Sequence, residues 1–105
     1  MTVARFDETI HPSTRLAIVS LLAASDWAEF AFVRDQLGLS DSALSKQLSV
    51  LEEAGYVGLE RRLAERRQRV RVQLTPEGRA AFAGHVAALR EIVAAADPAL
   101  GANLG

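Results

Sequence analysis

Small or flexible polar side chains recur along residues 41–54 at a spacing that places them together on one face of a helix. At about 100° per residue, that face collects Ser42, Ser45, Lys46 and Ser49. The opposite face collects Leu44, Leu48 and Leu51. Short hydroxyls and one flexible cation can reach the base edges in the major groove of DNA, which is roughly 12 Å wide. The pattern therefore predicts a helix that enters this groove, and the alternative is a plain solvated face.

A second chemical signal is a concentration of arginine in residues 61–71. Against one acid, Glu65, this segment holds Arg61, Arg62, Arg66, Arg67, Arg69 and Arg71. It carries a net charge of plus five, whereas the rest of the chain carries minus six. Arginine suits bidentate phosphate contact and insertion into a narrow minor groove. We expect Arg66 and Arg67 at the minor groove; the alternative is an edge strand whose charge prevents aggregation.

Helical elements precede these residues. Pro12 and the apolar spacing after it predict a helix over 12–25. Residues 26–29 predict a very short strand or turn, and Phe30, Val33 and Leu37 predict a second helix. Gly38 is suited to end that helix and Ser40 to begin the third, over 41–54. Two helices joined by a tight glycine turn are typical of a helix-turn-helix.

The chain then changes to a period of two. Residues 56–63 and 68–74 predict an antiparallel hairpin whose loop is 64–67. Thr75, Pro76 and Glu77 begin a last helix over 76–96, and Asp97-Pro98 ends it. We expect an N-terminal arm over 1–11 and a flexible tail over 97–105. The fold class is mainly α with a small β-hairpin (α+β), a winged helix-turn-helix in a single domain over 1–105.

Three runs of sequence carry a resemblance to a known family: HPSTRLAIVSLLAAS, FVRDQLGLSDSALSKQLSVLEEAGYV and VQLTPEGRAAFAGHVAAL. They resemble small stand-alone winged-helix members of the MarR/ArsR-like class of bacterial transcriptional regulators, over about residues 10–90. The resemblance implies a homodimer that binds a palindromic operator, most often as a repressor. It also implies base and backbone contacts from Ser42, Ala43, Ser45, Lys46, Gln47 and Ser49, and the wing adds Arg62, Arg66, Arg67 and Arg69.

The last helix carries an apolar seam. Its members, spaced by four, three and four residues, are Phe82, Val86, Leu89 and Val93. Such spacing suits pairing between helices, so we expect a dimerisation helix; the alternative is a monomer in which this helix folds back onto helix 12–25. His11 and His85 lack a second ligand at helical spacing, and we expect no metal site. Trp27 and Phe30 are expected in the core, where the first two helices join; the alternative is a platform on which bases stack.

Composition bounds the remaining possibilities. The 105 residues hold 12 basic and 13 acidic side chains and no cysteine, which excludes disulfides and thiolate chemistry. Motifs of common hydrolases and nucleotide-binding loops are absent, so we expect no enzyme and no cofactor. The charged first fifteen residues predict no secretory signal and the apolar stretches are too short to span a membrane, which favours a cytoplasmic protein. We predict a regulator that binds double-stranded DNA; the alternative is a winged-helix module that binds an acidic protein.

Overall fold

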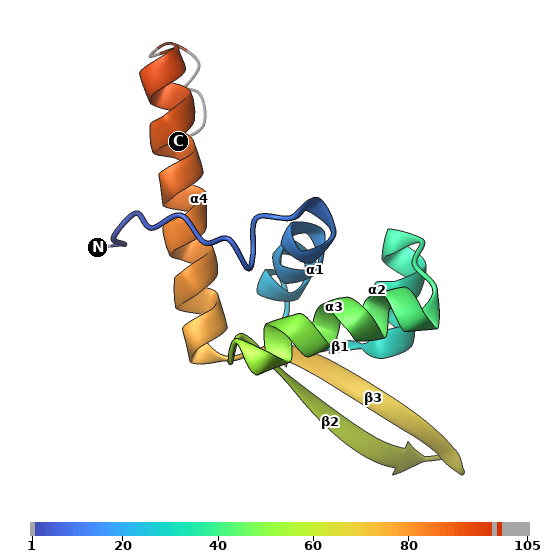
Figure 1. Ribbon diagram of the computed structural model, residues 1–105. Coiled ribbons are helices and arrows are strands. Elements are labelled where there is room, and N and C mark those ends of the chain that lie inside the picture. The colour runs from blue at the N-terminus through green and yellow to red at the C-terminus, as the bar shows by residue number, and fades with distance from the viewer. Residues whose placement is uncertain (1, 98, 100–105) are drawn as a thin grey trace.

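The computed structural model describes residues 2–97 and 99, and its elements follow the chain in the expected order (Figure 1). Helix α1 (Ser13–Ala23) leads through the two-residue strand β1 (Ala28–Glu29) into α2 (Phe30–Leu37) and α3 (Asp41–Glu53). Strands β2 (Val57–Ala64) and β3 (Arg67–Leu74) form the hairpin, and α4 (Pro76–Ala96) follows. The prediction of an α+β winged helix-turn-helix is confirmed.

The turn between α2 and α3 is built by Gly38 and Ser40. Gly38 has a φ of 65°, the left-handed conformation that glycine adopts at little cost. The Ser40 side chain accepts a 3.1 Å hydrogen bond from the Ala43 N–H and so caps α3. This sharp stop and restart sets the direction of the helix that carries the predicted polar face.

The sheet has the strand order β1-β3-β2, and both pairings are antiparallel. Val57 pairs with Leu74 at one end of the hairpin and Ala64 with Arg67 at the other. The loop is therefore shorter than predicted, because only Glu65 and Arg66 separate the strands. Both of these residues have positive φ, 53° and 64°, as a two-residue hairpin turn of the type I′ kind requires.

One core joins α1, α2, α3 and the sheet. Among its fully buried side chains are Ile18, Leu22, Val33, Leu44, Leu48, Leu51 and Val72. Burying a side chain of this size contributes about 1.5–3 kcal/mol. The three leucines of α3 are all inside, so the apolar face predicted for this helix is the face that packs on the core.

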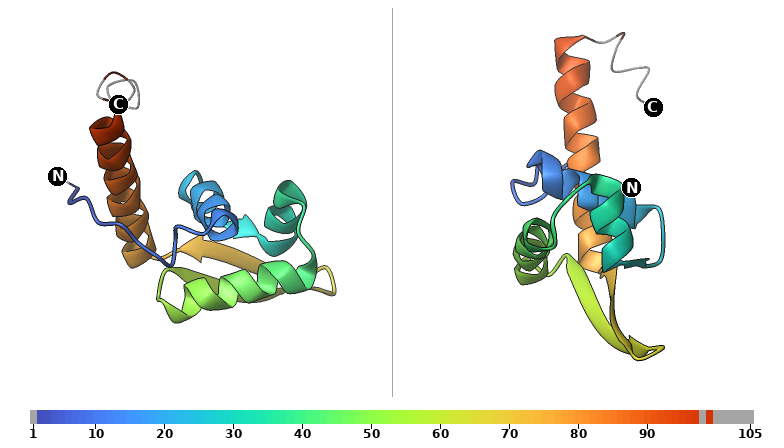
Figure 2. Two further views of the ribbon diagram at one scale, coloured as in Figure 1. Left: turned by 45° about the horizontal axis from the view of Figure 1, so that its top comes forward. Right: turned by 90° about the vertical axis from the view of Figure 1, so that its right-hand side faces the viewer.

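Helix α4 leaves the core and projects away from it, and the hairpin projects from the opposite end (Figures 1 and 2). Thr75 caps the helix by accepting from the Gly78 N–H at 2.9 Å, and Pro76 occupies its first turn. At Gly78 the helix passes so close to the Tyr56 backbone that a Cβ would lie 2.1 Å from the Tyr56 carbonyl oxygen. Only glycine fits at this crossing.

The N-terminal arm crosses α4 (Figure 1). The Arg5 N–H donates a 2.9 Å hydrogen bond to the Gly84 carbonyl, and a Cβ on Gly84 would lie 3.1 Å from the Val3 carbonyl oxygen. The arm is thus held against the middle of the helix. The predicted tail over 97–105 lies almost wholly outside the described residues. No helix within residues 2–97 is both long enough and apolar enough to cross a membrane.

Candidate nucleic-acid interface

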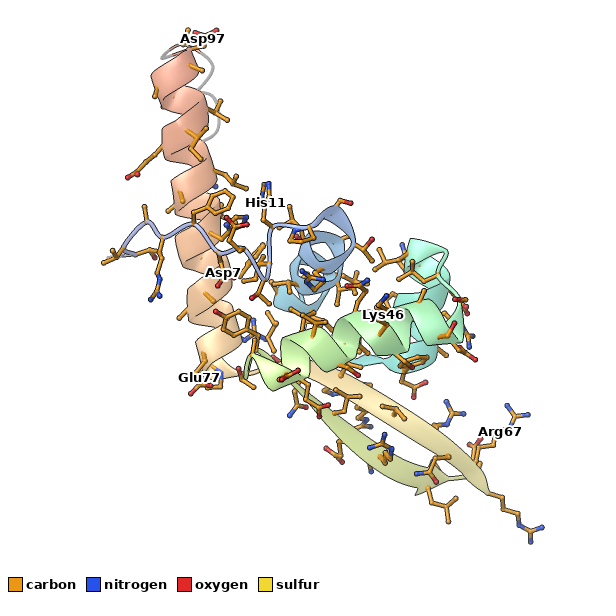
Figure 3. All side chains as sticks on the ribbon, in the orientation of Figure 1. Asp7, His11, Lys46, Arg67, Glu77 and Asp97 are labelled. Atoms are coloured by element: carbon orange, nitrogen blue, oxygen red, sulfur yellow. The ribbon has the colours of Figure 1, made fainter. Side chains whose placement is uncertain are left out.

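The polar face of α3 is open to solvent. Its exposed residues include the four predicted ones, Ser42, Ser45, Lys46 and Ser49. In the described part of the chain no carboxylate forms an ion pair with the Lys46 ammonium. Figure 3 shows Lys46 on α3, away from the hairpin tip where Arg67 lies. The helix therefore presents small hydroxyls and an unpaired cation together.

Ala43 and Gln47 occupy a different position on the same helix. Both are half-buried, on the flank between the core face and the exposed face. The Ala43 N–H is used by the Ser40 cap, and the Gln47 Oε1 accepts a 2.9 Å hydrogen bond from Arg15 of α1. The structure brings these two predicted residues to the edge of the exposed face, where Gln47 already has a partner.

Arg34 links α2 to the start of α3. Its guanidinium donates to Asp35 and to Asp41, in each case at 2.8 Å. These two hydrogen bonds raise the pKa of Arg34, and the pKa of Asp35 is lowered by its bond to Arg34. The exposed pairs add little stability, but they fix the first turn of α3 against α2. Sequence patterns did not indicate this link, because a surface pair between two helices has no local signature.

The fold divides the six arginines of the hairpin into two groups. Arg69 pairs with Glu29 of β1 at 3.0 Å, and the guanidinium of Arg71 stacks 3.7 Å from the ring centre of Trp27. Arg62 has a weaker pair with Glu60 at 3.7 Å. Among the described residues, no carboxylate pairs with the remaining three arginines and no aromatic ring stacks on them: Arg61, Arg66 and Arg67. The free charge thus concentrates toward the hairpin tip.

Trp27 corrects one expectation. It was predicted in the core, yet 42% of its surface is exposed and Arg71 covers one face of its ring. The guanidinium is attracted to the electron-rich ring face, and Arg71 is the residue that pairs with Glu29 where β1 joins β3. Phe30 does pack against the core as predicted. Near the tip, Leu63 is an apolar residue left 77% exposed.

The predicted seam of α4 is divided between two environments. All four residues are half-buried, and of these Phe82 packs against the chain's own core cluster. Ile92, outside the predicted seam, is 55% exposed. An apolar surface therefore remains on α4, displaced toward its C-terminal half.

A cluster that sequence reasoning missed lies where the arm meets α4. His85 is fully buried, and its Nδ1 accepts a 3.0 Å hydrogen bond from the Asp7 N–H. Its Nε2 lies 3.3 Å from Nδ1 of His11, and the Phe6 ring centre lies 4.7 Å from both imidazoles. Burial lowers the pKa of His85, and His11 lowers it further. In residues 2–97, no three potential metal ligands of the histidine, cysteine or carboxylate type come together.

Asp7 ties this cluster to the rest of the fold. The Tyr56 hydroxyl donates to its Oδ2 at 2.6 Å, and its Oδ1 accepts from the N–H groups of Thr9 and Ile10. The hydrogen bond to Asp7 raises the pKa of Tyr56, so the phenol stays protonated and remains a donor. Figure 3 shows Asp7 and His11 where the arm passes α4.

A helix-turn-helix packed on a three-stranded sheet, with a projecting arginine-bearing hairpin, defines the class of winged helix-turn-helix proteins. Residues 14–93, most of the chain, match the sequence pattern of the winged helix DNA-binding domain family. The chain belongs to this family.

Individual proteins are also similar to this chain in sequence or in fold. An uncharacterised protein of Methanocaldococcus jannaschii is 31% identical over 72 residues, which are 69% of this chain and 78% of that protein. A transcriptional regulator homologue from Pyrococcus horikoshii has a TM-score of 0.82 at 24% identity and covers 87% of this chain and 90% of its own. Its fold is shared over nearly the whole of both chains.

A second similar structure is ZitR of Lactococcus lactis, a zinc-responsive MarR family member. It has a TM-score of 0.62 at 22% identity, and the match covers 93% of this chain and 67% of ZitR. A variant of ZitR has also been solved in complex with DNA. The expected resemblance to MarR-like regulators is confirmed as a likeness of fold.

Proposed function

We propose that this chain is a transcriptional repressor that binds operator DNA as a homodimer. The observation that carries the proposal is the exposed face of α3, which presents Ser42, Ser45, Lys46 and Ser49 on a helix-turn-helix scaffold. Membership of a DNA-binding family supports the same function. The activity is binding with no catalytic step, and we place the protein in the cytoplasm, with no cofactor.

In this proposal, α3 binds in the major groove. A groove roughly 12 Å wide accepts one helix whose outward side chains are short or flexible. The hydroxyls of Ser42 and Ser45 lie in the first half of α3, where the helix dipole also favours phosphate oxygens. Lys46 and Ser49 extend the face by a further turn, so that base edges and backbone are within reach of one helix.

The wing supplies the second contact. Arg66 and Arg67 are exposed at the turn of the hairpin, and no acid among the described residues forms an ion pair with either of them. Their guanidinium groups are therefore free to bind phosphates or to enter an adjacent minor groove. We assign Arg62 and Arg69 a lesser part, because Glu60 and Glu29 already hold them.

Dimerisation would place two copies of α3 on one face of the duplex. Recognition helices of such dimers lie about 34 Å apart, one turn of DNA, which sets the distance between half-sites, and the two-fold symmetry of the dimer makes the operator palindromic. The half-buried Val86, Leu89 and Val93 on a helix that projects from the core support α4 as the pairing element.

A mobility-shift titration on genomic DNA fragments, repeated from low to high salt, tests the proposal. Phosphate contacts release counterions, so the apparent affinity should fall steeply as salt rises. A specific fragment should remain bound at salt concentrations that release unrelated DNA. Absence of binding at low salt, together with copurification of a stable acidic protein partner, would instead identify a protein-binding winged helix.

A further inference from the structure

Arg15 of α1 holds Gln47 of α3 across the helix-turn-helix. Its Nη1 donates a 2.9 Å hydrogen bond to Gln47 Oε1, and its Nε donates to the Thr9 carbonyl at 2.5 Å. Both side chains are half-buried. The guanidinium is therefore fixed at two points, one on the arm and one on the helix that carries the polar face.

The chemistry of arginine determines which way the Gln47 amide turns. A guanidinium has donors only, so the atom it contacts must be the amide oxygen and not the nitrogen. The NH₂ group of Gln47 then points away from Arg15. Gln47 lies on the flank of the exposed face, directly after Lys46 in sequence, and from there its two N–H donors can face a ligand bound on α3.

The other end of Arg15 is equally well held. Asp7 Oδ1 accepts hydrogen bonds from the Thr9 N–H at 2.8 Å and the Ile10 N–H at 3.1 Å, which closes the turn that carries the Thr9 carbonyl. Asp7 is itself held by Tyr56 and His85. A series of hydrogen bonds thus runs from α4 through the arm to α3, and it orients Arg15 before any ligand arrives.

We propose that Arg15 is a positioning residue that makes Gln47 a hydrogen-bond donor at the DNA interface and so sets base preference at one position of each half-site. This inference rests on the proposed function. An unrestrained glutamine pairs with adenine, for which it needs both its oxygen and its nitrogen. With the oxygen engaged by Arg15, the remaining donors match the two acceptors of guanine, O6 and N7.

Selection of bound sequences from a random DNA pool tests this assignment with Arg15→Lys. Lysine keeps the positive charge but lacks the planar fork that contacts Thr9 and Gln47 together. The variant should retain overall affinity for unrelated DNA and its salt dependence. At one position per half-site, preference for guanine over adenine should fall by about fivefold or more. A purely structural role would weaken all sequences equally.

Two further variants keep the test independent of folding defects. Gln47→Glu retains the oxygen that accepts from Arg15 but replaces the donors with a second acceptor, so preference at the same position should move toward cytosine, which offers a donor. Arg79→Lys is the matched control, since Arg79 also donates to backbone carbonyls, those of Ala23 and Ser25, but lies away from α3. It should leave every base preference unchanged.

The outcomes separate the inference from the proposed function. If the unaltered protein selects no sequence, the proposed function itself fails. If it selects a clear operator and Arg15→Lys leaves the preference at every position unchanged, the positioning role of Arg15 is overturned while DNA binding stands, whatever Gln47→Glu does. If the double variant Arg15→Lys with Gln47→Ala matches Gln47→Ala alone, the two residues act as one unit, as the proposal requires.

Discussion

Asp7 donates its backbone N–H to Nδ1 of His85 over 3.0 Å, and this single bond fixes the protonation state of a fully buried imidazole. Because Nδ1 is the acceptor, the neutral ring carries its proton on Nε2, which faces Nδ1 of His11 at 3.3 Å. A second proton on His85 would oppose the Asp7 N–H and add a charge inside the fold. The attachment of the arm to α4 therefore depends on a neutral His85.

Stability should consequently fall in mild acid. The pKa of His85 is lowered by burial and by His11, although Asp7 and Glu8 oppose part of this shift. Above the unfolded value of about 6.5 the ring is neutral in both states, and below it the unfolded chain binds the proton more readily. The stabilisation is thus present above about pH 6.5 and is lost as the pH falls toward the lower folded value.

Urea denaturation at pH 7.5 and pH 5.5 measures this loss. The variant His85→Asn can still accept from Asp7 through its amide oxygen but does not titrate. Its overall stability will differ, so the comparison is the change between the two pH values. A change as large in His85→Asn as in the unaltered chain would contradict the role given to His85.

Removing the two free arginines of the wing should weaken DNA binding without altering sequence preference. Arg66→Ala with Arg67→Ala removes phosphate contacts, so affinity should fall on all sequences and the dependence of affinity on salt should become less steep by up to about two counterions. Mobility shift across a salt series measures both quantities. Arg90→Ala removes an equally exposed charge from α4 and serves as the control, for which the salt dependence should not change.

Changes on the exposed face of α3 should instead alter preference between sequences. Lys46→Ala or Ser45→Ala removes a side chain assigned to the major groove, and loss of a base contact costs about 1–3 kcal/mol on the preferred operator. Competition between the selected operator and single-base variants of it measures the difference. Equal weakening on operator and unrelated DNA would show that these residues contact only the backbone.

Gly78→Ala should destabilise the fold. The new Cβ would lie 2.1 Å from the Tyr56 carbonyl oxygen, an atom that also accepts the Thr75 N–H at the start of α4. Relief requires α4 to move, at a cost of at least about 2 kcal/mol of unfolding free energy. Gly58→Ala is the matched control, because the nearest atom to its Cβ would be the flexible Gln73 side chain at 3.7 Å. Equal denaturation midpoints for the two variants would rule out the tight crossing.

Light scattering tests the proposed dimer. The unaltered chain should have about twice the 11.3 kDa of one copy, and Leu89→Asp with Val93→Asp should produce monomers because the charges would be buried in the helix pair. Glu91→Lys changes the exposed opposite side of α4 and should leave the dimer intact. A monomeric unaltered chain at micromolar concentration would contradict both the dimer and a palindromic operator.

Local signals predicted the parts of this fold that local physics controls. The period of α3 gave its buried leucines, and Thr75, Pro76 and the Asp97-Pro98 pair gave the bounds of α4. Each hairpin strand runs one residue closer to the turn than the sequence pattern predicts. The pattern misses the tight turn because Glu65 and Arg66 adopt positive φ without the asparagine or glycine that usually marks it.

Pairings between distant residues could not be predicted in this way. Arg15 meets Gln47 across 32 positions, and Arg69 meets Glu29 across 40. These contacts follow from how α1 and β1 pack, and neither residue type nor spacing carries a trace of them. A count of six arginines likewise overestimates the free charge of the wing. Arg69 is paired with Glu29, and Arg71 is stacked on Trp27.

The most direct test of the account is selection of DNA from a random pool by the unaltered chain, because one experiment reports binding, symmetry and spacing. The account predicts an enriched palindrome whose half-site centres lie about 10 base pairs apart. Recovery of no enriched sequence, or of a single site without symmetry, would contradict a homodimeric regulator that places α3 in the major groove.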